Sequence, residues 1–353
     1  MDAMITLLPG DGIGPEVTAS GKAVLKAIEL SFGHKFKFEE KYIGGAAIDQ
    51  FNDPLPSDTQ KSCLDSNAVI LGAVGGPKWD DPNAKIRPEQ GLLSLRKLLG
   101  VFANIRPIKV YPSLKKSSPL KEEKLDDVDL IVIRELTGGI YFGEKKRSEK
   151  KASDLCEYHE FEVTRIIRKA ADIAMQRQRK LCSVDKANVL ETSRFWRDIT
   201  SKIVSREYQD IEIEHILVDA AAMYLINNPS DFDVVVTENM FGDILTDEAS
   251  MLSGSLGMLP SASLGDGSIG LYEPIHGSAP DITGTKSANP CGMIGSIAML
   301  LRHSLNLQEE AEIIEGAMFD VIEGGARTKD IAEENDRIIN TDEMTQLIID
   351  KII

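Results

Sequence analysis

The chain has 353 residues and a formal net charge of −16; 42% of its residues are hydrophobic and 27% are charged. These values are ordinary for a globular protein of about two domains, and the negative charge argues against non-specific binding to nucleic acid. No apolar run approaches the roughly 20 residues that span a bilayer, so we expect neither a nucleic-acid nor a membrane partner.

The N-terminus and the cysteines indicate a reducing compartment. The opening MDAMITLLPGDG has no basic region of the kind that begins a signal peptide, and it is not rich in arginine like a transit peptide. Four cysteines lie far apart without a CxxC pair: Cys63, Cys156, Cys182 and Cys291. This spacing disfavours zinc ribbons and redox motifs, so we expect a cytoplasmic protein.

The first segment, LLPGDGIGPE (residues 7–16), resembles a phosphate-binding loop because an apolar strand, MITLL, precedes closely spaced glycines. The glycines stand at alternate positions: Gly10, Gly12 and Gly14. The dinucleotide fingerprint requires Gly-x-Gly-x-x-Gly, and here Pro15 stands where the spacing needs glycine. Pro15 and Glu16 suit the first turn of a helix. The pattern predicts strand, tight turn and helix, and the glycines alone favour a plain turn over a phosphate site.

Farther along, short apolar runs alternate with helical periodicity, which predicts an α/β fold with a largely parallel sheet. The candidate strands are residues 68–74, 129–135, 181–187, 215–220 and 233–239. Residues 160–178 and 344–353 carry apolar side chains at helical spacing. Residues 253–295 are rich in glycine and proline and predict a long series of turns. Because that run is longer than a simple connection between two elements needs to be, we expect it to form a binding surface.

Each predicted strand runs into a residue that could bind a ligand or do chemistry. These residues are Gly75–Gly76, Arg134, Asp185–Lys186, Asp219 and Asp243. Ligands of open α/β sheets bind beyond the carboxyl ends of the strands. A charged residue at the end of a single strand is often there only because that end is exposed to solvent. Five strand ends of this kind predict a shared cleft.

Asp243 and Asp247 are four residues apart, which places both carboxylates on one face if the segment is helical. No basic residue adjoins them in the sequence, so they would repel each other unless a divalent cation lay between them. Mg²⁺ typically takes one or two carboxylates together with substrate oxygens and water. Asp219 is a third candidate ligand. A solvated acidic helix face is the alternative, and the pair alone favours it.

Basic and phenolic side chains complete the candidate chemistry. Arginine suits bidentate binding of carboxylates, and three occupy predicted cleft positions: Arg96, Arg106 and Arg134. A single arginine is usually a surface residue, but three in a protein of charge −16 suggest a substrate with more than one carboxylate.

Near a divalent cation the charged form of Lys186 would be disfavoured and the amine could act as a base, while Tyr141 could donate a proton. A surface ion pair is the alternative for Lys186, and half-buried packing is the favoured alternative for Tyr141.

Long blocks of the sequence resemble the isocitrate/isopropylmalate dehydrogenase family of β-decarboxylating dehydrogenases. In family order they include LLPGDGIGPEV, RPEQGLLSLRK, IVIRELTGGIYFGE, VDKANVLETSRFWR, TENMFGDILTDEAS and YEPIHGSAPDITGTKSANP. The resemblance implies a two-domain α/β fold with a large mixed, mostly parallel sheet that is not a standard Rossmann fold. It implies a first, cofactor-binding domain of residues 1–101 plus 254–353, and a second domain of residues 102–253 for dimerisation, metal and substrate.

The resemblance also implies roles for individual residues. NAD would be bound by Ile13, Gly76, Pro77, Glu89, His276, Gly277, Ser278, Ala279, Pro280, Asp281, Ile282 and Asn289. The substrate would be bound by Arg96, Arg106, Arg134, Asp219, Glu89, Leu92, Leu93 and Asn188. Mg²⁺ or Mn²⁺ would be bound by Asp219, Asp243 and Asp247, with Lys186 as the base and Tyr141 as the acid. Lys186 and Asp219 would reach the site from the partner subunit, which implies a homodimer with a shared active site.

The block GLLSLRK matches the isopropylmalate branch of the family. Leu92 and Leu93 adjoin Arg96, and burying an isopropyl group against them could contribute roughly 1.5–3 kcal/mol, whereas an anionic group there would face Glu89. The alternative is that both leucines belong to the core. Asp281 follows HGSAP, and an acidic residue there would accept hydrogen bonds from a ribose 2′-hydroxyl, which predicts NAD⁺ over NADP⁺.

The implied activity is NAD-dependent oxidative decarboxylation of 3-isopropylmalate to 4-methyl-2-oxopentanoate and CO₂, a step of leucine biosynthesis. A related enzyme acting on homoisocitrate, tartrate or malate is the first alternative. A non-catalytic nucleotide-binding subunit on the same scaffold is the second. Such a subunit would be expected to have lost Lys186, Tyr141 or one of the aspartates, and all are present.

Overall fold

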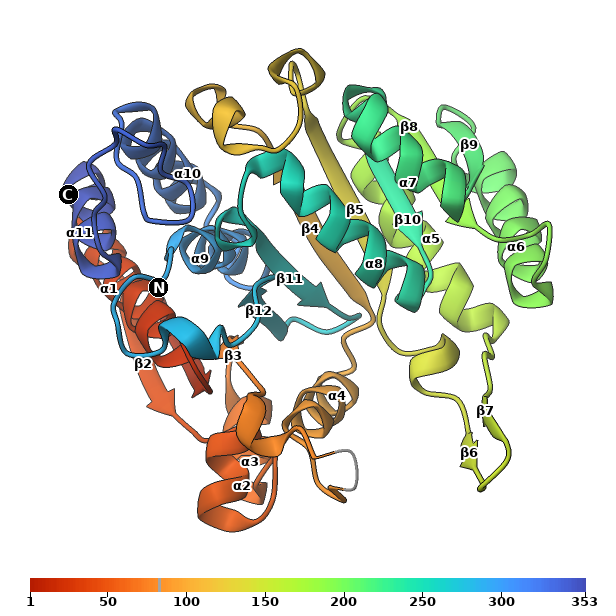
Figure 1. Ribbon diagram of the computed structural model, residues 1–353, viewed down its shortest axis with the longest axis horizontal. Coiled ribbons are helices and arrows are strands. Elements are labelled where there is room, and N and C mark those ends of the chain that lie inside the picture. The colour runs from red at the N-terminus through yellow and green to blue at the C-terminus, as the bar shows by residue number, and fades with distance from the viewer. Residues whose placement is uncertain (82–83) are drawn as a thin grey trace. The chain divides into compact units, whose positions relative to one another are not determined.

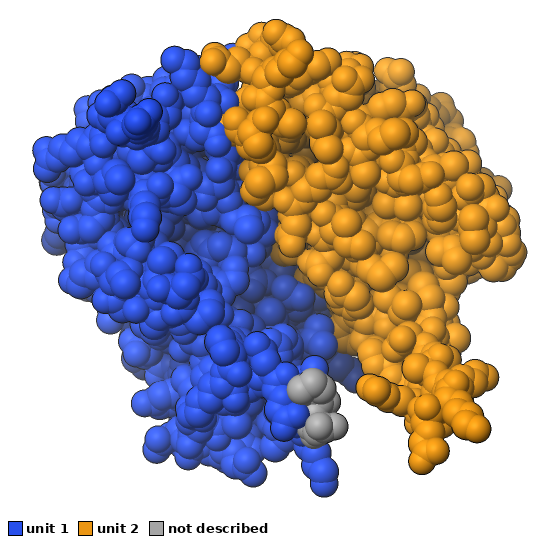
Figure 2. Space-filling view, viewed as in Figure 1, with its two compact units in different colours: residues 1–101, 111–117, 253–353 blue, residues 102–110, 118–252 orange. Residues whose placement is uncertain are grey.

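The computed structural model describes residues 1–81 and 84–353, and the chain forms two compact units (Figure 2). Unit 1 comprises residues 1–101, 111–117 and 253–353, and unit 2 comprises residues 102–110 and 118–252. Residues 111–117 and Ser253 fall in unit 1, whereas the sequence-based division assigned them to the second domain. The backbone explains the first difference, because Ser113 receives a hydrogen bond from Arg327 at 3.2 Å and donates one to Glu323 at 3.1 Å.

Five strands of unit 1 lie in the order β2-β1-β3-β12-β11. Their bounds are β1 (Asp2–Gly10), β2 (Lys35–Glu40), β3 (Ala68–Ala73), β11 (Pro260–Leu264) and β12 (Gly270–Pro274). All neighbouring pairs are parallel except β11 and β12. β3 is buried along its whole length, as expected for a central strand covered on both faces.

The helices of unit 1 cover both faces of these strands (Figure 1). They are α1 (Gly14–Phe32), α2 (Gly44–Phe51), α3 (Ser57–Asp65), α4 (Pro88–Leu99), α9 (Cys291–His303), α10 (Gln308–Glu323) and α11 (Thr341–Ile352). Short 3₁₀ helices are η1 (Pro77–Trp79), η2 (Pro112–Ser117), η7 (Leu256–Met258) and η8 (Pro280–Ile282). α1 and α9 pack on the strands and carry α10 and α11 outside them, while α2, α3 and α4 pack together.

Unit 2 contributes five strands in the order β4-β5-β10-β8-β9. Their bounds are β4 (Ala103–Lys109), β5 (Asp129–Glu135), β8 (Lys180–Asp185), β9 (Glu212–Leu217) and β10 (Val234–Thr237). Only the pair β4 and β5 is antiparallel. A separate hairpin consists of β6 (Lys145–Arg147) and β7 (Ala152–Asp154). The α/β class and the mixed, mostly parallel strand arrangement are therefore confirmed.

The helices of unit 2 form two packed pairs (Figure 1). They are α5 (Glu160–Met175), α6 (Glu191–Glu207), α7 (Val218–Asn227) and α8 (Asn239–Ser250). Short 3₁₀ helices are η3 (Glu122–Lys124), η4 (Gly139–Tyr141), η5 (Pro229–Asp231) and η6 (Met251–Ser253), the last of which ends at the boundary with unit 1. α5 packs on α6 over a core that contains Trp196, and α7 packs on α8.

The structure corrects three local expectations. Residues 215–220 are not all strand, because β9 ends at Leu217 and α7 begins at Val218, so that Asp219 lies in a first helical turn. Residues 233–239 end their strand at Thr237, where Glu238 caps α8 by accepting a hydrogen bond from the Phe241 N–H. Residues 253–295 are not a plain series of turns, since they include β11 and β12.

Other expectations are confirmed. The opening segment is strand, turn and helix, with Pro15 and Glu16 in the first turn of α1. α5 and α11 occupy the two segments with helical periodicity. Among the helices of residues 1–81 and 84–353, none combines the length and the apolar character needed to cross a lipid bilayer.

Candidate active site

Two of the predicted arginines project from one face of the antiparallel pair β4 and β5. Arg134 lies directly opposite Asn104, and Arg106 is two residues farther along β4. Because side chains two residues apart on a strand point to the same face, Asn104, Arg106 and Arg134 form a single row. All three are at least 94% buried. Buried guanidinium groups need charged or polar partners, so their surroundings determine which way they point.

Helix α8 supplies those partners to Arg134 because it lies unusually close to the strands. A Cβ atom on Gly242 would lie 2.7 Å from Arg134 Cγ, so a side chain there would push the helix away. Arg134 Nη1 donates to Asp243 Oδ1, and Asp243 Oδ2 accepts a hydrogen bond from the Tyr141 hydroxyl at 2.8 Å. The helix thus brings a predicted carboxylate, a predicted arginine and the predicted acid together.

Arg106 is held by the same helix. Its Nη1 donates to the Thr246 hydroxyl and its Nε donates to Asn104 Oδ1 at 2.5 Å. Its guanidinium lies 3.9 Å from Asp243 and 4.0 Å from Asp247. The premise that the two aspartates lack a basic neighbour is therefore wrong in three dimensions, since arginines from β4 and β5 offset their repulsion.

Asp247 keeps access to solvent, yet packing around it raises the pKa of its carboxyl. Burial is the main cause, Arg106 opposes the shift, and the neighbouring Asp243 adds to it. A carboxylate with a raised pKa gains from a nearby cation, because the cation favours its charged form. The Asp243–Asp247 pair on α8 therefore has the chemistry of a divalent-cation site.

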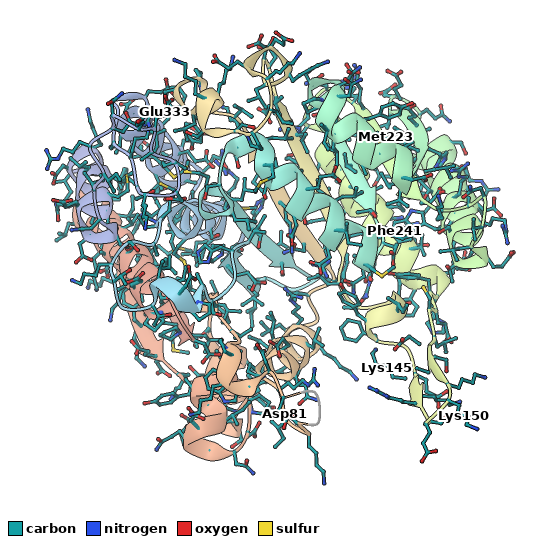
Figure 3. The ribbon with its side chains drawn as sticks, viewed as in Figure 1. Asp81, Lys145, Lys150, Met223, Phe241 and Glu333 are labelled. Atoms are coloured by element: carbon teal, nitrogen blue, oxygen red, sulfur yellow. The ribbon has the colours of Figure 1, made fainter. Side chains whose placement is uncertain are left out.

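Tyr141 lies at the end of the 3₁₀ turn η4. Burial, reinforced by the hydrogen bond to Asp243, raises the pKa of its phenol to about 12. The backbone of this turn is tied by Lys145 (labelled in Figure 3), whose Nζ donates to the carbonyls of Ile140 at 3.1 Å and Tyr141 at 2.9 Å. The phenol is consequently a proton donor at neutral pH, held in a fixed turn.

Lys186 and Asp219 form a second cluster in unit 2. Lys186 follows β8 and Asp219 lies in the first turn of α7, and Nζ donates to Asp219 Oδ1 at 2.6 Å. This hydrogen bond is the main reason that the pKa of Asp219 is lowered. Asn188 lies exposed in the turn between β8 and α6.

The predicted carboxylates of one chain supply only part of a metal site. In residues 1–81 and 84–353, no three His, Cys, Asp or Glu side chains gather closely enough to hold a metal ion. Asp243 and Asp247 share one face of α8, whereas Asp219 is paired with Lys186. One chain therefore offers an all-oxygen pair of the kind that Mg²⁺ or Mn²⁺ prefers, with the third predicted ligand in a separate cluster.

In unit 1, the glycine-rich turn after β1 is organised by Asp11, a buried residue. Its carboxylate accepts hydrogen bonds from the backbone N–H groups of Gly45 at 2.8 Å, Ala46 at 2.7 Å and Gly75 at 2.8 Å. Burial nevertheless raises the pKa of the Asp11 carboxyl. Asp11 therefore joins the end of β1 to the start of α2 and to the loop after β3.

The same turn receives the predicted cofactor loop. The Ile13 N–H donates to the Ser278 carbonyl at 2.9 Å, and a Cβ atom on Gly12 (φ +59°) would lie 2.0 Å from that oxygen. Ala279 has a left-handed backbone (φ +40°). His276 Nε2 is buried with no hydrogen-bond partner among the described residues, and burial lowers the pKa of this imidazole. An unpartnered buried ring nitrogen beside fixed backbone fits a loop that binds a polar cofactor.

The remaining cofactor candidates differ in exposure. Gly277, Pro280 and Asp281 are exposed and Ile282 is partly exposed, so these residues are accessible to a ligand. Asn289 is buried and already engaged, since its amide donates to Asp330 at 3.0 Å and its Oδ1 accepts from the Cys291 N–H at 3.0 Å. Its side chain therefore shapes the start of α9.

Helix α4 carries the predicted specificity residues. Arg96 is buried and donates to Glu273 at 2.9 Å, while its Nε has no partner among the described residues. Leu92 packs partly on the core around Leu8 and Ile43, which agrees with the alternative that it is a core residue. Leu93 is partly exposed.

Glu89, also on α4, lies beside the loop that follows β3, because a Cβ atom on Gly75 would lie 2.8 Å from the Glu89 carboxylate. Gly76 and Pro77 come directly after Gly75 in this loop.

Sequence reasoning missed the residues that orient the predicted groups. They are Asp11, Asn104, Lys145, Asn239, Thr246 and Glu273. Asp11 could have been noticed as the acidic residue between two glycines, and Glu273 as a carboxylate at the end of a strand. Asn239 and Thr246 have no such signal, because their partners lie more than 100 residues away in sequence.

Comparison with known proteins shows what the chain is similar to. Residues 4–348 match the family model "Isocitrate/isopropylmalate dehydrogenase". A 3-isopropylmalate dehydrogenase of Rhodopirellula baltica is 55% identical over 357 residues, covering 100% of this chain and 99% of the relative. One of Bacillus subtilis is 54% identical over 342 residues, covering 95% and 93%.

Solved structures give the same result. The isocitrate dehydrogenase of Methylococcus capsulatus is 33% identical with a TM-score of 0.88, covering 99% of both chains. A β-decarboxylating dehydrogenase of Thermococcus kodakarensis is 34% identical with a TM-score of 0.80, covering 99% of this chain and 96% of the other. The chain therefore belongs to the isocitrate/isopropylmalate dehydrogenase family.

Proposed function

We propose that this protein is an enzyme that catalyses NAD-dependent oxidative decarboxylation of 3-isopropylmalate to 4-methyl-2-oxopentanoate and CO₂, in leucine biosynthesis. The family and relatives that are more than 50% identical over nearly the whole chain support this reaction. The observation that carries it is the cluster on α8, where Asp243 contacts both Arg134 and Tyr141. An anion-binding arginine, a carboxylate and a proton donor meet there at one point.

The residues of the chain have distinct tasks in this reaction. Arg96, Arg106 and Arg134 bind the two carboxylates of the substrate, because a planar guanidinium matches a carboxylate. Lys186 accepts the proton of the C2 hydroxyl as the C2 hydride departs, which gives a 3-carboxy-2-keto acid. Loss of CO₂ from the ionised C3 carboxylate then leaves an enolate, and Tyr141 provides a proton to its C3 carbon, which gives the 2-keto acid.

Two bound groups complete the proposal. Asp243 and Asp247 of one chain, with Asp219, hold Mg²⁺ or Mn²⁺, which supplies Lewis-acid polarisation of the substrate oxygen. The loop at 276–282, with Ile13, Glu89, Gly76–Pro77 and Asn289, holds NAD⁺, which supplies the hydride acceptor. His276 Nε2 is the buried atom in this loop that a cofactor hydrogen bond would satisfy.

Substrate choice rests on α4. Leu93 is partly exposed next to the buried Leu95 and Arg96, so an apolar substituent can pack there while the arginine binds a carboxylate. We assign Leu93, with the exposed edge of Leu92, to the isopropyl group. Glu89 is exposed on the same helix and disfavours an anionic substituent.

We further propose a homodimer in which Lys186 and Asp219 act in the partner's active site. α7 and α8 pack on each other and expose apolar side chains, among them Met223 (62% exposed; Figure 3), Tyr224, Ile226 and Ile244 (57%). Single exposed apolar residues are ordinary, but a cluster on one helix pair indicates an interface. A second copy of this chain explains both this surface and the separation of Asp219 from the α8 pair.

The cytoplasm is the compartment that we propose. All four cysteines are free thiols, and burial raises the pKa of Cys63 to about 12 and that of Cys182 and Cys291 as well. Thiols of this kind are poorly reactive and remain reduced in a reducing compartment.

An assay of NADH formation tests the function. With Mg²⁺, turnover of 3-isopropylmalate is expected to exceed that of homoisocitrate, tartrate and malate, because only the first places an apolar group at Leu93. EDTA is expected to abolish turnover, and Mg²⁺ or Mn²⁺ to restore it. A clear preference for another acid would contradict the substrate, and undiminished turnover in EDTA would contradict the metal.

Cofactor preference provides a second test. Replacing Asp281 with lysine is expected to raise the NADP⁺/NAD⁺ ratio of kcat/KM about tenfold or more, because a carboxylate that accepts from the ribose 2′-hydroxyl becomes a cation that attracts a 2′-phosphate. Asp266→Lys is the matched control, since the exposed Asp266 lies in the turn at the opposite end of β12. An unaltered ratio would remove Asp281 from ribose binding.

A further inference from the structure

We propose that Asn239, the first residue of α8, is a positioning residue that sets the direction of Arg134 and the placement of the turn that carries Tyr141. This inference rests on the proposed function, because both of those groups are assigned to the reaction. Asn239 is 1% exposed. No ligand can reach its side chain, so it acts only through its neighbours.

One end of the Asn239 amide engages Arg134. Its Oδ1 accepts from Arg134 Nε at 3.1 Å and from Nη2 at 2.8 Å. An acceptor bridging these two nitrogens lies along one edge of the guanidinium and fixes its plane, while Asp243 engages Nη1. With the plane fixed, the direction in which the arginine meets a substrate carboxylate is also fixed.

The other end of the amide engages the turn that holds Tyr141. Asn239 Nδ2 donates to the Gly138 carbonyl at 3.3 Å, immediately before η4 (Gly139–Tyr141). The Tyr158 ring lies beneath this turn, because a Cβ on Gly139 (φ +74°) would lie 2.5 Å from its hydroxyl oxygen. The amide therefore joins a substrate-binding side chain to the segment that carries the proton donor.

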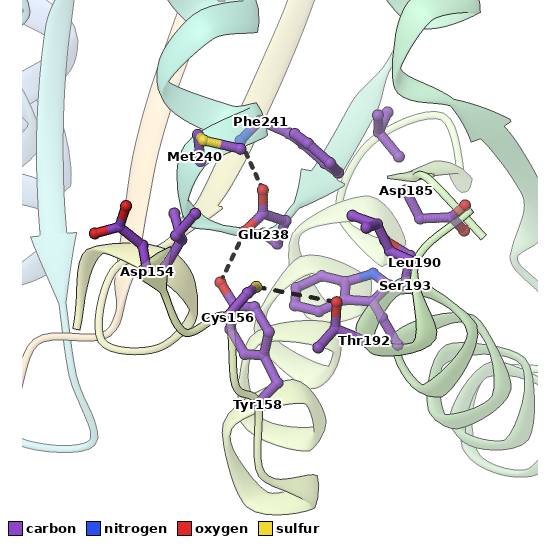
Figure 4. Close-up of a pocket in the computed structure, with 13 residues that line it drawn as sticks. Asp154, Cys156, Tyr158, Asp185, Leu190, Thr192, Ser193, Glu238, Met240 and Phe241 are labelled. Carbon is purple, nitrogen blue, oxygen red and sulfur yellow. Dashed lines mark hydrogen bonds between the residues drawn. The ribbon is translucent and has the colours of Figure 1, made fainter. Parts of the chain in front are cut away.

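Asn239 itself is held from the opposite side. Its backbone N–H donates to the Tyr158 hydroxyl at 3.0 Å, and that hydroxyl donates to Glu238 at 3.1 Å. Glu238 also accepts from the Phe241 N–H at 2.9 Å, and Figure 4 draws both of its contacts. The start of α8 is thus anchored by buried groups, which limits how far Asn239 can move.

The chemistry of the site demands an amide. Asn239 must accept from a cation at one end and donate to a carbonyl at the other, and asparagine does both. Aspartate keeps the acceptor and loses the donor, whereas leucine, of similar size, loses both. The two substitutions therefore separate the effect on Arg134 from the effect on the Tyr141 turn.

The experiment measures kcat, the KM for NAD⁺, the melting temperature and the calorimetric Kd for 3-isopropylmalate with Mg²⁺. Asn239→Leu is expected to weaken 3-isopropylmalate binding about tenfold and also to lower kcat, since a misplaced catalytic group costs rate. Asn239→Asp is expected to keep the Kd within about threefold of wild type and to lower kcat. Asn228→Ala, which removes an amide that contacts Asp231 at the end of α7, is the control with unchanged values.

Several outcomes would overturn the proposal. A wild-type Kd and a wild-type kcat in Asn239→Leu would do so. An equal loss of kcat and of 3-isopropylmalate affinity in both variants, together with a changed KM for NAD⁺, would also do so, because it would indicate a general structural role. An inactive wild type would instead contradict the proposed function. The variants are therefore also titrated with malate, which carries both carboxylates, and an unchanged malate Kd in Asn239→Leu would refute the role of Asn239 whatever the substrate.

Discussion

Replacing Lys186 with alanine is expected to lower kcat by about 10²- to 10⁴-fold, the range associated with a general acid or base. Lys186 is partly buried, and its Nζ lies 2.6 Å from Asp219 Oδ1. Alanine leaves no group to accept the C2 hydroxyl proton there. The Kd for NAD⁺ is expected to stay within about twofold, because Lys186 is not among the residues proposed to bind NAD⁺.

The measurement is single-turnover NADH formation with saturating 3-isopropylmalate, alongside fluorescence titration of NAD⁺. Lys180→Ala is the matched control, because Lys180 is an exposed lysine at the opposite end of the same strand, β8. The control is expected to keep wild-type turnover. Wild-type kcat in Lys186→Ala would remove this amine from the reaction.

The strand ends could be predicted from the sequence. Runs such as AVILGAV and DLIVIRE are continuous and apolar because parallel strands are covered on both faces, and the residues after them lie at one edge of the strands. That reasoning placed Arg134 and Lys186 at strand ends, and the structure has them there: Arg134 is the last but one residue of β5, and Lys186 directly follows β8. The same reasoning extended the strand before Asp219 too far. When an apolar run continues from a strand directly into a helix, its hydrophobic periodicity does not show where the strand ends.

The contacts between predicted residues could not be derived in the same way. Arg134 meets Asp243 across 109 positions of sequence, and nothing near either residue indicates the other. The argument from repulsion between Asp243 and Asp247 failed for this reason, since it counted only sequence neighbours. The resemblance to a known family did assign the residues, but it left out the groups that orient them, Asn239 above all.

Close approach of α8 to β5 explains much of this arrangement. Gly242 allows the helix to lie against the Arg134 side chain, so residues 239, 243 and 246 reach the arginines of β4 and β5. A helical spacing of four and three residues and a strand spacing of two residues meet there at one row of contacts. The same helix presents Asp247 and the exposed Ile244, so the proposed metal site and the proposed dimer contact share one element.

Asp243→Asn is expected to lower kcat/KM for 3-isopropylmalate by at least about 100-fold, the upper end of the loss typical for groups that only support metal ligands. The amide keeps the size of the side chain but removes the charge that faces Arg134 and a divalent cation. Higher Mg²⁺ should be needed for half-maximal activity. The pKa of Tyr141 should also fall, because Asp243 contributes to raising it to about 12, and absorbance at 295 nm would detect this as earlier phenol ionisation.

Mixed dimers of Asp243→Asn and Lys186→Ala provide the decisive outcome. If Lys186 acts in the partner's site, each mixed dimer contains one site with both substitutions and one with neither. Each mixed dimer should then regain about half of the wild-type kcat, and an equimolar, fully exchanged mixture of the two nearly inactive proteins about a quarter. If both residues act within one chain, every site carries one substitution and no activity returns. Asp198→Asn, an exposed change on α6, mixed with Lys186→Ala is the control for mixing itself, because half of all sites keep Lys186 in either case, with or without subunit exchange. Failure to recover activity when subunit exchange is demonstrated would refute the shared site while leaving the tasks of Lys186 and Asp243 intact.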